Sequence, residues 1–470
     1  MKMKKLLGLS RSVCSASALL LCAAVLLLPS SAVALPPSLG TVVITVPNTV
    51  LSGDIISAPI ADGLVARIKN AGELNNVKIS AGHRGVLLES ADLTVKNSNI
   101  SSTGLGSLGS AVYLNNSTIN IADSVISTAH GYGIYAKNGS AVTVKGGSIK
   151  TTAIISSFYG KDYALYGESG SSIEINGTNI EVSGDRVSGV SVKKESTLKL
   201  VNSNIDVSGR ETNGIWIQRA SSADIKDTVV TMRNILGTGV YIKNSSAVQM
   251  DNVQVTSYGT GYGVSIIDEW PDPYLPAVPQ IIKNSLIKTY GNYSSGVIAV
   301  NEGSKVSVID TNIETAGESA FGVHSYGDTS HLEMKGGSLT TTGKGASAGY
   351  ATTGGIITLD STKISVGGDA YTFDLETARM NLKNIDTITN SGLLALTHTI
   401  GILNIESSKV KGSIANKADF GRNGYFDVSL TDSIWSGDAN SNASVSEAMI
   451  NINLDNRSLW NVTGDSYTNG

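Results

Sequence analysis

One position that recurs about every 25 residues constrains this 470-residue chain more than any other feature. It follows a short apolar segment each time, as in Val-Lys-Asn-Ser at 95–98 and Ile-Lys-Asp-Thr at 225–228. These residue types tolerate a left-handed backbone or hydrogen-bond their own turn, so the column predicts one sharp bend per repeat. All sixteen positions hold Asn, Asp, Gly or Ser: Asn76, Asn97, Asp123, Gly146, Gly177, Asn202, Asp227, Asn252, Asn284, Asp310, Gly336, Ser361, Asn384, Ser407, Asp432 and Asn456.

Between these bends, apolar and polar residues alternate with a period of two. Residues 239–242, 247–250 and 253–256 form three such runs in one repeat, each closed by a turn. This period is typical of strands and not of helices. Three strands in a repeat of 21 to 32 residues indicate stacked coils, because one coil cannot bury its own apolar face. We therefore expect an all-β, right-handed parallel β-helix (solenoid) of about 16 coils, with three short strands per coil.

The first 34 residues have the pattern of a secretory signal peptide. Four basic residues precede an apolar run that ends at Leu28, and small residues at 32–34 offer a cleavage site. A membrane anchor is the alternative, but the run is short. Cys14 and Cys22 both lie in this segment, so we expect no disulfide in the mature chain. Its removal leaves 31 basic against 39 acidic residues, a net charge of about −8 that argues against nucleic acid as a partner.

The last repeats carry a more specific pattern, Ser-Ile-Trp-Ser-Gly-Asp at 433–438 and Ser-Leu-Trp-Asn-Val-Thr-Gly-Asp at 458–465. Together with the repeats and the signal peptide, it resembles the passenger domains of pertactin-like autotransporters, the proteins of type V secretion. The resemblance covers almost the whole chain. It implies a signal peptide at 1–34, an N-terminal cap at 35–72, a parallel β-helix passenger at 73–415 and autochaperone-like capping coils at 416–470.

The same resemblance implies a folding cap and a partner. The cap residues would be Trp435, Asp438, Trp460, Gly464 and Asp465, and the cap would help to nucleate folding outside the cell. The two tryptophans also have a simpler interpretation, as large side chains that close the end of a solenoid. The partner would be an outer-membrane β-barrel translocator, which is absent from these 470 residues and which a downstream gene could encode.

Polysaccharide lyases and hydrolases also use the parallel β-helix, so enzymatic activity is an alternative that the fold alone cannot decide. The densest charge lies at 185–211, where Asp185 and Arg210, and likewise Arg186 and Glu211, are one repeat apart. This spacing favours surface ion pairs between coils over a catalytic cluster. The five histidines show no metal-ligand spacing, and we expect no catalytic residue, metal or cofactor.

Tyrosines gather in the loops that follow the third strand of a repeat. Tyr258 and Tyr290 lie at the same offset from Asn252 and Asn284, so they should stack one coil apart. Exposed tyrosines suit protein or glycan ligands, whereas a tyrosine ladder that only stabilises the stack is the alternative. The loop tyrosines are Tyr132, Tyr159, Tyr163, Tyr258, Tyr262, Tyr290 and Tyr293.

A Pro-rich insertion at 267–279 lengthens one repeat to 32 residues and carries Trp270 and Tyr274. A stiff exposed loop on a rigid scaffold can be a recognition element, although neutral decoration is equally compatible with it. The candidate ligand-binding residues are therefore Tyr258, Tyr262, Tyr290, Tyr293, Trp270 and Tyr274.

These features predict a protein exported through the periplasm to the cell surface or outer membrane of a Gram-negative bacterium, or released from it. It would act as an adhesin or related virulence factor that binds a host protein or glycan. A polysaccharide lyase or hydrolase is one alternative. A structural surface rod without a dedicated ligand is the other.

Overall fold

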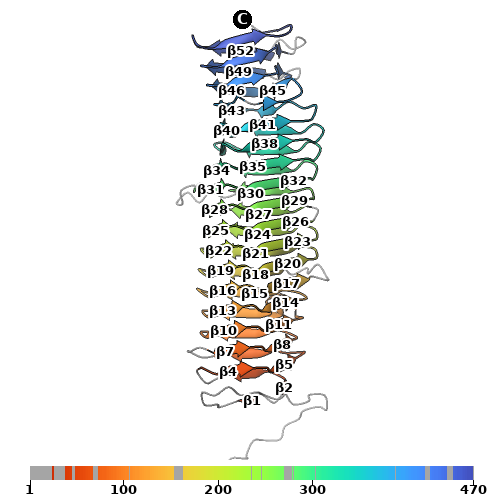
Figure 1. Ribbon diagram of the computed structural model, residues 1–470, viewed down its shortest axis with the longest axis vertical. Helices are drawn as coiled ribbons and strands as arrows, with labels where there is room; N and C mark the ends of the chain where they lie inside the picture. The colour runs from red at the N-terminus through yellow and green to blue at the C-terminus, as the bar shows by residue number, and fades with distance from the viewer. Residues whose placement is uncertain are drawn as a thin grey trace, which may run out of the picture.

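The computed structural model is a slender rod of stacked coils with the C-terminus at one end (Figure 1). It describes residues 24–25, 38–44, 48–66, 72–104, 106–152, 162–233, 236–244, 246–268, 278, 280–301, 303–386, 388–418, 424–441 and 448–468. Each coil contributes one strand to each of three parallel sheets, giving about 15 turns, so the predicted all-β parallel β-helix is confirmed. No helix within these ranges is both long and apolar enough to cross a membrane.

The strands fall into sheets A, B and C, and sheet D continues the face of sheet C at the C-terminal end. Sheet A contains β1 (Ala24–Val25), β3 (Val42–Ile44), β6 (Leu64–Ala66), β9 (Val86–Glu89), β12 (Val112–Asn115), β15 (Tyr132–Lys137), β18 (Asp162–Glu168), β21 (Val187–Lys193), β24 (Asn213–Gln218), β27 (Thr238–Lys243), β30 (Tyr262–Ile267), β33 (Ser295–Val300), β36 (Phe321–Tyr326), β39 (Ser347–Thr352), β42 (Phe373–Glu376), β45 (Leu393–Thr397), β48 (Ser413–Asn416) and β51 (Ala439–Ser441). Sheet B contains β4 (Val50–Ser52), β7 (Gly72–Asn75), β10 (Asp92–Lys96), β13 (Thr118–Ala122), β16 (Ala141–Lys145), β19 (Ser172–Asn176), β22 (Thr197–Val201), β25 (Ser222–Lys226), β28 (Ala247–Asp251), β31 (Gln280–Lys283), β34 (Lys305–Ile309), β37 (His331–Lys335), β40 (Ile356–Asp360), β43 (Ala378–Lys383), β46 (Ile400–Glu406), β49 (Gly424–Thr431) and β52 (Ala448–Leu454). Sheet C contains β2 (Ser38–Leu39), β5 (Ile55–Ala58), β8 (Lys78–Ala81), β11 (Asn99–Ser102), β14 (Val125–Thr128), β17 (Ser148–Thr152), β20 (Asn179–Ser183), β23 (Asn204–Ser208), β26 (Val229–Met232), β29 (Gln254–Ser257), β32 (Leu286–Thr289), β35 (Asn312–Thr315), β38 (Ser338–Thr341), β41 (Lys363–Val366) and β44 (Ile388–Thr389). Sheet D contains β47 (Lys409–Lys411), β50 (Ile434–Gly437) and β53 (Leu459–Val462), and a 3-10 helix, η1 (Gly106–Gly109), precedes β12.

In-register pairing stacks like residues on like residues inside the rod. Sheet C shows this best, because one inward-facing position is Ile, Val or Leu in every coil from β8 to β41, and each of these side chains is at most 1% exposed. Burial of one such side chain contributes about 1.5–3 kcal/mol, so the columns are the main source of stability. The column is Ile79, Ile100, Ile126, Ile149, Ile180, Ile205, Val230, Val255, Ile287, Ile313, Leu339 and Ile364.

The predicted bends connect sheet B to sheet C. Fifteen of the sixteen positions have a positive φ, between 44° and 69°. Asn456, in the last described coil, has no positive φ. In that turn the side chain of Asp455 bonds to the residues that follow it. The Asp455 carboxylate accepts hydrogen bonds from Arg457 N at 3.2 Å and from Ser458 Oγ at 2.5 Å.

A ladder of buried hydroxyl groups follows the bends. Ser285 Oγ accepts a hydrogen bond from Val253 N at 3.1 Å, and Thr311 Oγ1 accepts one from Ser285 N at 3.2 Å. The same pattern joins Ser408 to Ile385 and Ser433 to Ser408. These hydroxyls satisfy main-chain N–H groups at the corners, where no strand pairing is available.

Glycines set the corner where sheet C turns into sheet A. A Cβ on Gly239 would lie 2.3 Å from Val255 Cγ1 and 2.6 Å from Gly263 O. Gly263 and Gly296 are equally crowded by Ile287 and Ile313 of sheet C. Only glycine allows the two sheets to approach this closely.

The coil architecture extends beyond the predicted passenger boundaries. Strands β2 to β6 lie within 35–72, the predicted N-terminal cap, and pair in parallel with the coils that follow. Strands β49 to β53 extend it through 416–470 in the same way. β1 lies within the predicted signal peptide and pairs with β3.

The third face of the rod is interrupted once. β44 pairs with β41 and β47 pairs with β50, but across the described coils no ladder joins β44 to β47. Asn390 spans this interruption, since its Nδ2 donates to Thr372 Oγ1 at 2.9 Å and to Lys411 O at 3.3 Å. The architecture therefore has a boundary between β44 and β47, ahead of residue 416.

The bend column gives a first prediction, on Asn252 (φ 54°). Replacing Asn252 by Ala or by Gly removes the hydrogen bond from its Nδ2 to Asp227 Oδ1 in both cases. Because only Ala carries a Cβ into the left-handed region, we expect Asn252→Ala to be less stable than Asn252→Gly by about 1 kcal/mol. Urea unfolding followed by circular dichroism measures the difference, and equal midpoints would contradict the role given to the bend.

Candidate binding surface

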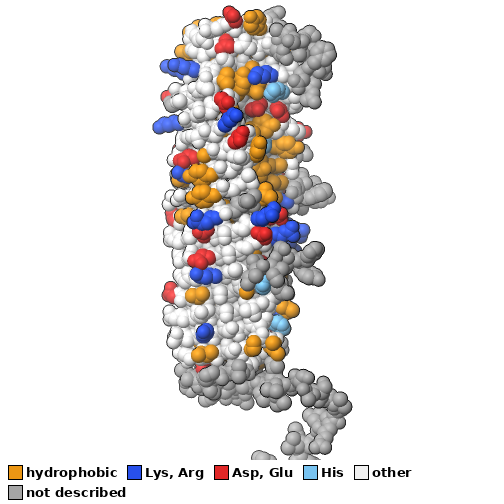
Figure 2. All heavy atoms as spheres, turned by 90° about the vertical axis from the view of Figure 1, so that its right-hand side faces the viewer, with side chains coloured by type: hydrophobic (Ala, Val, Ile, Leu, Met, Phe, Trp, Pro, Cys, Tyr) orange, Lys and Arg blue, Asp and Glu red, His pale blue; other side chains and the backbone are white. Residues whose placement is uncertain are grey.

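Three of the six predicted ligand-binding residues, Tyr258, Tyr290 and Tyr293, lie on turns that lead from sheet C to sheet A. Tyr262 does not lie in a loop, which corrects the prediction, because it is the first residue of β30. Figure 2 shows hydrophobic side chains gathered in a strip along the right-hand side of the upper half of the rod, with charged side chains at its ends. We give the name C–A turn surface to a set of residues on or next to these turns in successive coils. It comprises Arg233, Leu236, Tyr258, Tyr262, Tyr290 and Tyr293.

Tyr258 and Tyr290 stack one coil apart, as predicted. Their ring centroids lie 5.2 Å apart, their planes differ by 8°, and the residues are 53% and 46% exposed. Each tyrosine is fixed to the preceding coil by a main-chain hydrogen bond. Tyr258 N donates to Met232 O and Tyr290 N donates to Ser257 O, both at 2.9 Å. The Arg233 guanidinium lies 5.9 Å from the Tyr258 ring, and its Nε donates to Asp206 Oδ1 at 3.0 Å. The Arg233 guanidinium and the rings of Tyr258 and Tyr290 thus form one continuous exposed stack.

Tyr262 and Tyr293 lie beside this stack in an open groove of about 520 Å³. Tyr262 is half-buried at the start of β30, and Tyr293 is 72% exposed just before β33. Leu236, 52% exposed, forms the third apolar wall. Sequence reasoning missed Leu236, although it occupies the same turn one coil earlier.

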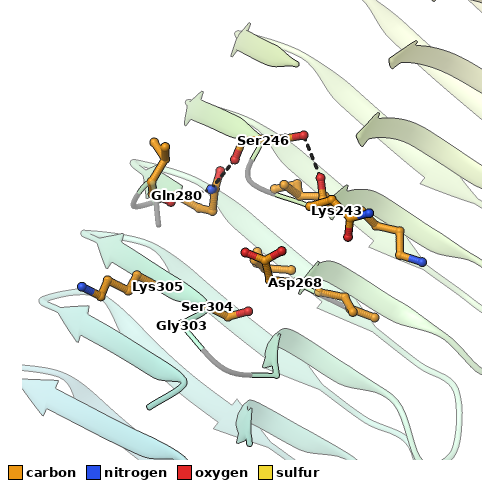
Figure 3. A pocket seen from close by; sticks show the side chains of 12 residues that line it. Lys243, Ser246, Asp268, Gln280, Gly303, Ser304 and Lys305 are labelled. Atoms are coloured by element: carbon orange, nitrogen blue, oxygen red, sulfur yellow. Dashed lines mark hydrogen bonds between the residues drawn. The ribbon is translucent and has the colours of Figure 1, made fainter. Parts of the chain in front are cut away.

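The predicted insertion leaves β30 at Asp268 and rejoins the stack at Gln280. Trp270 and Tyr274 lie outside the described residues, so their placement stays a prediction. At the base of the insertion, Gln280 Nε2 donates to Ser246 O at 2.6 Å (Figure 3). Gln280 Oε1 accepts a hydrogen bond from Val248 N at 2.7 Å. The cavity beside it, of about 20 Å³ among the described residues, has room for about one water molecule. Gln280 therefore anchors the base of the insertion, and this cavity is too small for an organic ligand.

A second aromatic group covers the outer face of sheet A. The prediction that Tyr132 and Tyr163 lie in loops is wrong, because they are the first residue of β15 and the second residue of β18. Tyr159 lies outside the described residues. The Tyr132 and Tyr163 rings stack at 5.8 Å within a cluster in which three tyrosines are less than 9% exposed. This burial fits the stabilising ladder better than a ligand site. The cluster is Tyr113, Tyr132, Tyr135, Tyr163, Tyr166, Trp216 and Tyr241.

Titratable side chains meet on the same face further along. His324, Tyr350 and Asp374 occupy paired positions of β36, β39 and β42, and Glu376 accepts a hydrogen bond from Tyr350 Oη at 3.1 Å. Burial, and then the charge of Glu376, raise the pKa of Asp374 to about 6. Burial lowers the pKa of His324 to about 4. If the rod hydrolysed a polysaccharide, Asp374 would be a better candidate for the acid than Asp185, because a general acid needs a raised pKa.

The charged residues at 185–211 follow the predicted spacing but not fully the predicted contacts. Arg186 Nε lies 3.0 Å from Glu211 Oε2, which confirms that ion pair. Asp185 Oδ1 instead accepts a hydrogen bond from the main-chain N of Arg210 at 2.9 Å, so the predicted side-chain pair is wrong. Over the described ranges, no group of three or more His, Cys, Asp and Glu side chains is arranged to hold a metal ion.

The predicted cap residues lie in the last two coils. The Trp435 and Trp460 rings stack at 4.9 Å with planes 3° apart, and Trp435 is fully buried. Each indole N–H donates to a carbonyl oxygen, of Gly412 and Gly437 respectively, at 2.9 Å. Asp438 Oδ1 accepts from Ser413 Oγ at 2.5 Å.

The other two cap residues are less engaged. Gly464 faces Asp438 across one coil, since a Cβ added there would lie 3.7 Å from it. Asp465 is exposed to solvent. The structure therefore brings Trp435, Asp438, Trp460 and Gly464 together but leaves Asp465 at the surface.

Comparison with known proteins supports the fold. Residues 110–270 match the family model described as a right handed beta helix region. The structure is similar to Vag8, a Bordetella autotransporter passenger, solved as the Vag8–C1 inhibitor complex. That match has a TM-score of 0.61 and 15% identity, and covers 93% of this chain and 97% of Vag8. Tailspike protein 3 of bacteriophage CBA120 aligns over 74% of this chain and 57% of its own at 13% identity, but its TM-score of 0.23 carries no structural argument. No curated protein matches the sequence.

The tryptophan stack gives a prediction on folding kinetics. Trp460 joins the last described coil to the preceding one, through its stack on Trp435 and the hydrogen bond from its indole N–H to Gly437 O. We expect Trp460→Ala to slow refolding from urea much more than it changes the final circular dichroism spectrum. Tyr467→Ala, 58% exposed in the same segment, is the control. Equal refolding rates for Trp460→Ala and the unaltered protein would exclude a seeding role.

Asp374 gives a prediction on pH dependence. A carboxyl whose pKa is raised on folding stabilises most when protonated, and this stability falls as the pH rises from about 4 to about 6. Asp374→Asn should therefore be more stable than the unaltered protein at pH 7.5, by at most about 3 kcal/mol, and equally stable near pH 4. Thermal unfolding at both pH values measures this, with Asp310→Asn at an exposed bend as control. A difference that does not depend on pH would contradict the prediction.

Proposed function

We propose that this protein is an extracellular binding protein of the autotransporter-passenger type and that it binds a host protein or glycan through the C–A turn surface. The exposed stack of Tyr258 on Tyr290 carries the proposal. Large aromatic side chains with polar ends are enriched where proteins bind partners, since they supply contact area at little entropic cost.

The rod makes this surface rigid before any ligand arrives. Main-chain hydrogen bonds to neighbouring coils fix each of the turns that carry Tyr258, Tyr290, Leu236 and Tyr293. Because these turns need not be ordered on binding, the entropic cost of association is reduced. A rigid rod also holds the turns away from the surface to which one end is attached.

Export supports an extracellular site of action. The signal pattern at 1–34 favours passage through the periplasm, and the C-terminal Trp pattern favours delivery by an outer-membrane β-barrel translocator. Vag8, with a similar fold, forms a complex with C1 inhibitor. A host-protein partner for this chain rests on that analogy, and a glycan partner rests on the chemistry of the turns. Adhesion or another role in virulence would follow from either.

The test is binding by the purified passenger to mammalian cell monolayers, plasma proteins and an oligosaccharide array. We expect the double variant Tyr258→Ala/Tyr290→Ala to lose about tenfold or more in affinity for the partner, because truncation of a central aromatic residue typically costs 2 kcal/mol or more. Tyr425→Ala, 37% exposed on the sheet B face, is the matched control.

Two outcomes would contradict the proposal. Unchanged binding by the double variant would place the contact surface elsewhere on the rod. Failure of the unaltered protein to bind any probe would favour a structural rod.

A further inference from the structure

Two bulky apolar residues on the C–A turn surface adopt a conformation that such side chains avoid. Leu236 has a φ of 63° and Tyr293 a φ of 57°, and both are mostly exposed. A left-handed backbone is unfavourable for residues with a large side chain, and such strain is concentrated at functional sites. Neither residue fills the core, so packing does not explain why the strain is kept.

The same turn position in other coils shows what the fold itself requires. It holds Arg186 (φ 61°), Glu211 (φ 55°), Ser319 (φ 51°) and Gly345 (φ 66°). Polar or small residues thus serve the bend in these coils. The apolar side chains of Leu236 and Tyr293 are additional to what the bend needs, and both line one groove.

The groove crosses three successive coils along the rod. Leu236, Tyr262 and Tyr293 form its apolar walls, and Gly237 and Gly261 form its floor. A Cβ on Gly261 would lie 1.8 Å from Gly237 O, so position 261 must be glycine and adds no side chain to the floor. The coils keep this groove open.

The described lining residues include no charged side chain. Hydroxyl and amide groups stand beside the aromatic rings instead, from Thr260 and Asn292. Asn292 Oδ1 accepts a hydrogen bond from Glu318 N at 2.9 Å, which fixes the side chain and leaves its amide nitrogen to donate to a ligand. Aromatic faces bordered by neutral polar groups match a sugar ring, which presents C–H groups on its face and hydroxyls around its edge.

A peptide is a poorer fit, because the main chain here is already paired. Leu236 N donates to Thr260 O and Tyr293 N to Glu318 O, both at 2.9 Å. The turns therefore offer no free strand edge for an added peptide strand. Recognition must use side chains, and those in the groove are neutral.

We propose that this groove binds a neutral oligosaccharide, with a pyranose ring stacked against Tyr293 and Tyr262 and its hydroxyl groups bonded to Thr260 and Asn292. The inference rests on the proposed binding function and names the ligand class for part of the same surface. The stack of Tyr258 on Tyr290 extends the aromatic surface for further sugar units.

The test uses the full-length passenger and two panels of oligosaccharides of four to six units. One panel is neutral, built from glucose, galactose and N-acetylglucosamine, and the other contains the sulfated and sialylated counterparts. The variants are Leu236→Asn and Tyr293→Asn, because Asn tolerates the left-handed backbone. Ser319→Asn makes the same change at the same turn position outside the groove. Affinity is measured by calorimetry, and ring contacts by saturation-transfer NMR.

We expect the neutral panel to bind with an affinity that added salt does not change. Tyr293→Asn should lower that affinity about tenfold, since loss of one aromatic stacking contact is of this size. Ser319→Asn should not change the affinity. The melting temperatures of Leu236→Asn and Tyr293→Asn should be equal to or above that of the unaltered protein, because the strain is relieved.

Three results would overturn the proposal: no oligosaccharide bound, binding confined to the charged panel with strong salt dependence, or equal affinity in Tyr293→Asn. If the Tyr258→Ala/Tyr290→Ala variant still loses binding to cells or plasma proteins in these cases, the proposed function stands and only the ligand class of the groove is wrong. If that variant also binds unchanged, both fail.

Discussion

The parallel hydrogen-bond ladder between one coil and the next is the interaction on which the rest of this structure depends. It fixes a repeat of about 4.8 Å along the rod and forces each side chain against its counterpart one coil away. Inside, this alignment produces the aliphatic columns and the hydroxyl ladder from Ser285 to Thr311. Outside, it produces ion pairs such as Arg186 with Glu211 and ring stacks such as Tyr258 with Tyr290. Most surface features are consequences of the stacking of coils. A surface feature that the stacking does not require is therefore a better candidate for a function.

The bend column made the fold predictable, because a left-handed residue leaves a clear compositional trace. It also fixed the register of sheet C, and so the stack of Tyr258 on Tyr290 followed from their equal offsets. Register in sheet A was not accessible in the same way, because the C–A turns differ in length. This is why Tyr132 and Tyr163 were misplaced and why the meeting of His324, Tyr350 and Asp374 was missed. The crowded glycines, such as Gly239 and Gly263, mark the start of sheet A and would have supplied that register.

Two other differences have a more local origin. The spacing of Asp185 and Arg210 predicted that the two residues face each other, but spacing does not identify which of their atoms meet. Asp185 Oδ1 accepts a hydrogen bond from the main-chain N of Arg210 and not from its guanidinium. Leu236 was overlooked because one leucine in a turn has no sequence context that reveals a positive φ. The fold is similar to that of Vag8 although only 15% of the residues are identical, so the fold does not depend on particular residues at most positions. Columns of the right residue classes are enough to form the rod, whereas individual turn residues are not needed for it and can differ between rods of this kind.

The interruption between β44 and β47 has a mechanical meaning. Tension along the rod loads the ladders of all three faces in parallel wherever the faces are continuous. At this coil two faces keep their ladders, and the third is held by single hydrogen bonds, from Lys409 N to Ile385 O at 2.7 Å and from Asn390 Nδ2 to Lys411 O at 3.3 Å. Under tension along the rod, the coils on either side of this point are therefore expected to separate first, because one of their three faces has no ladder.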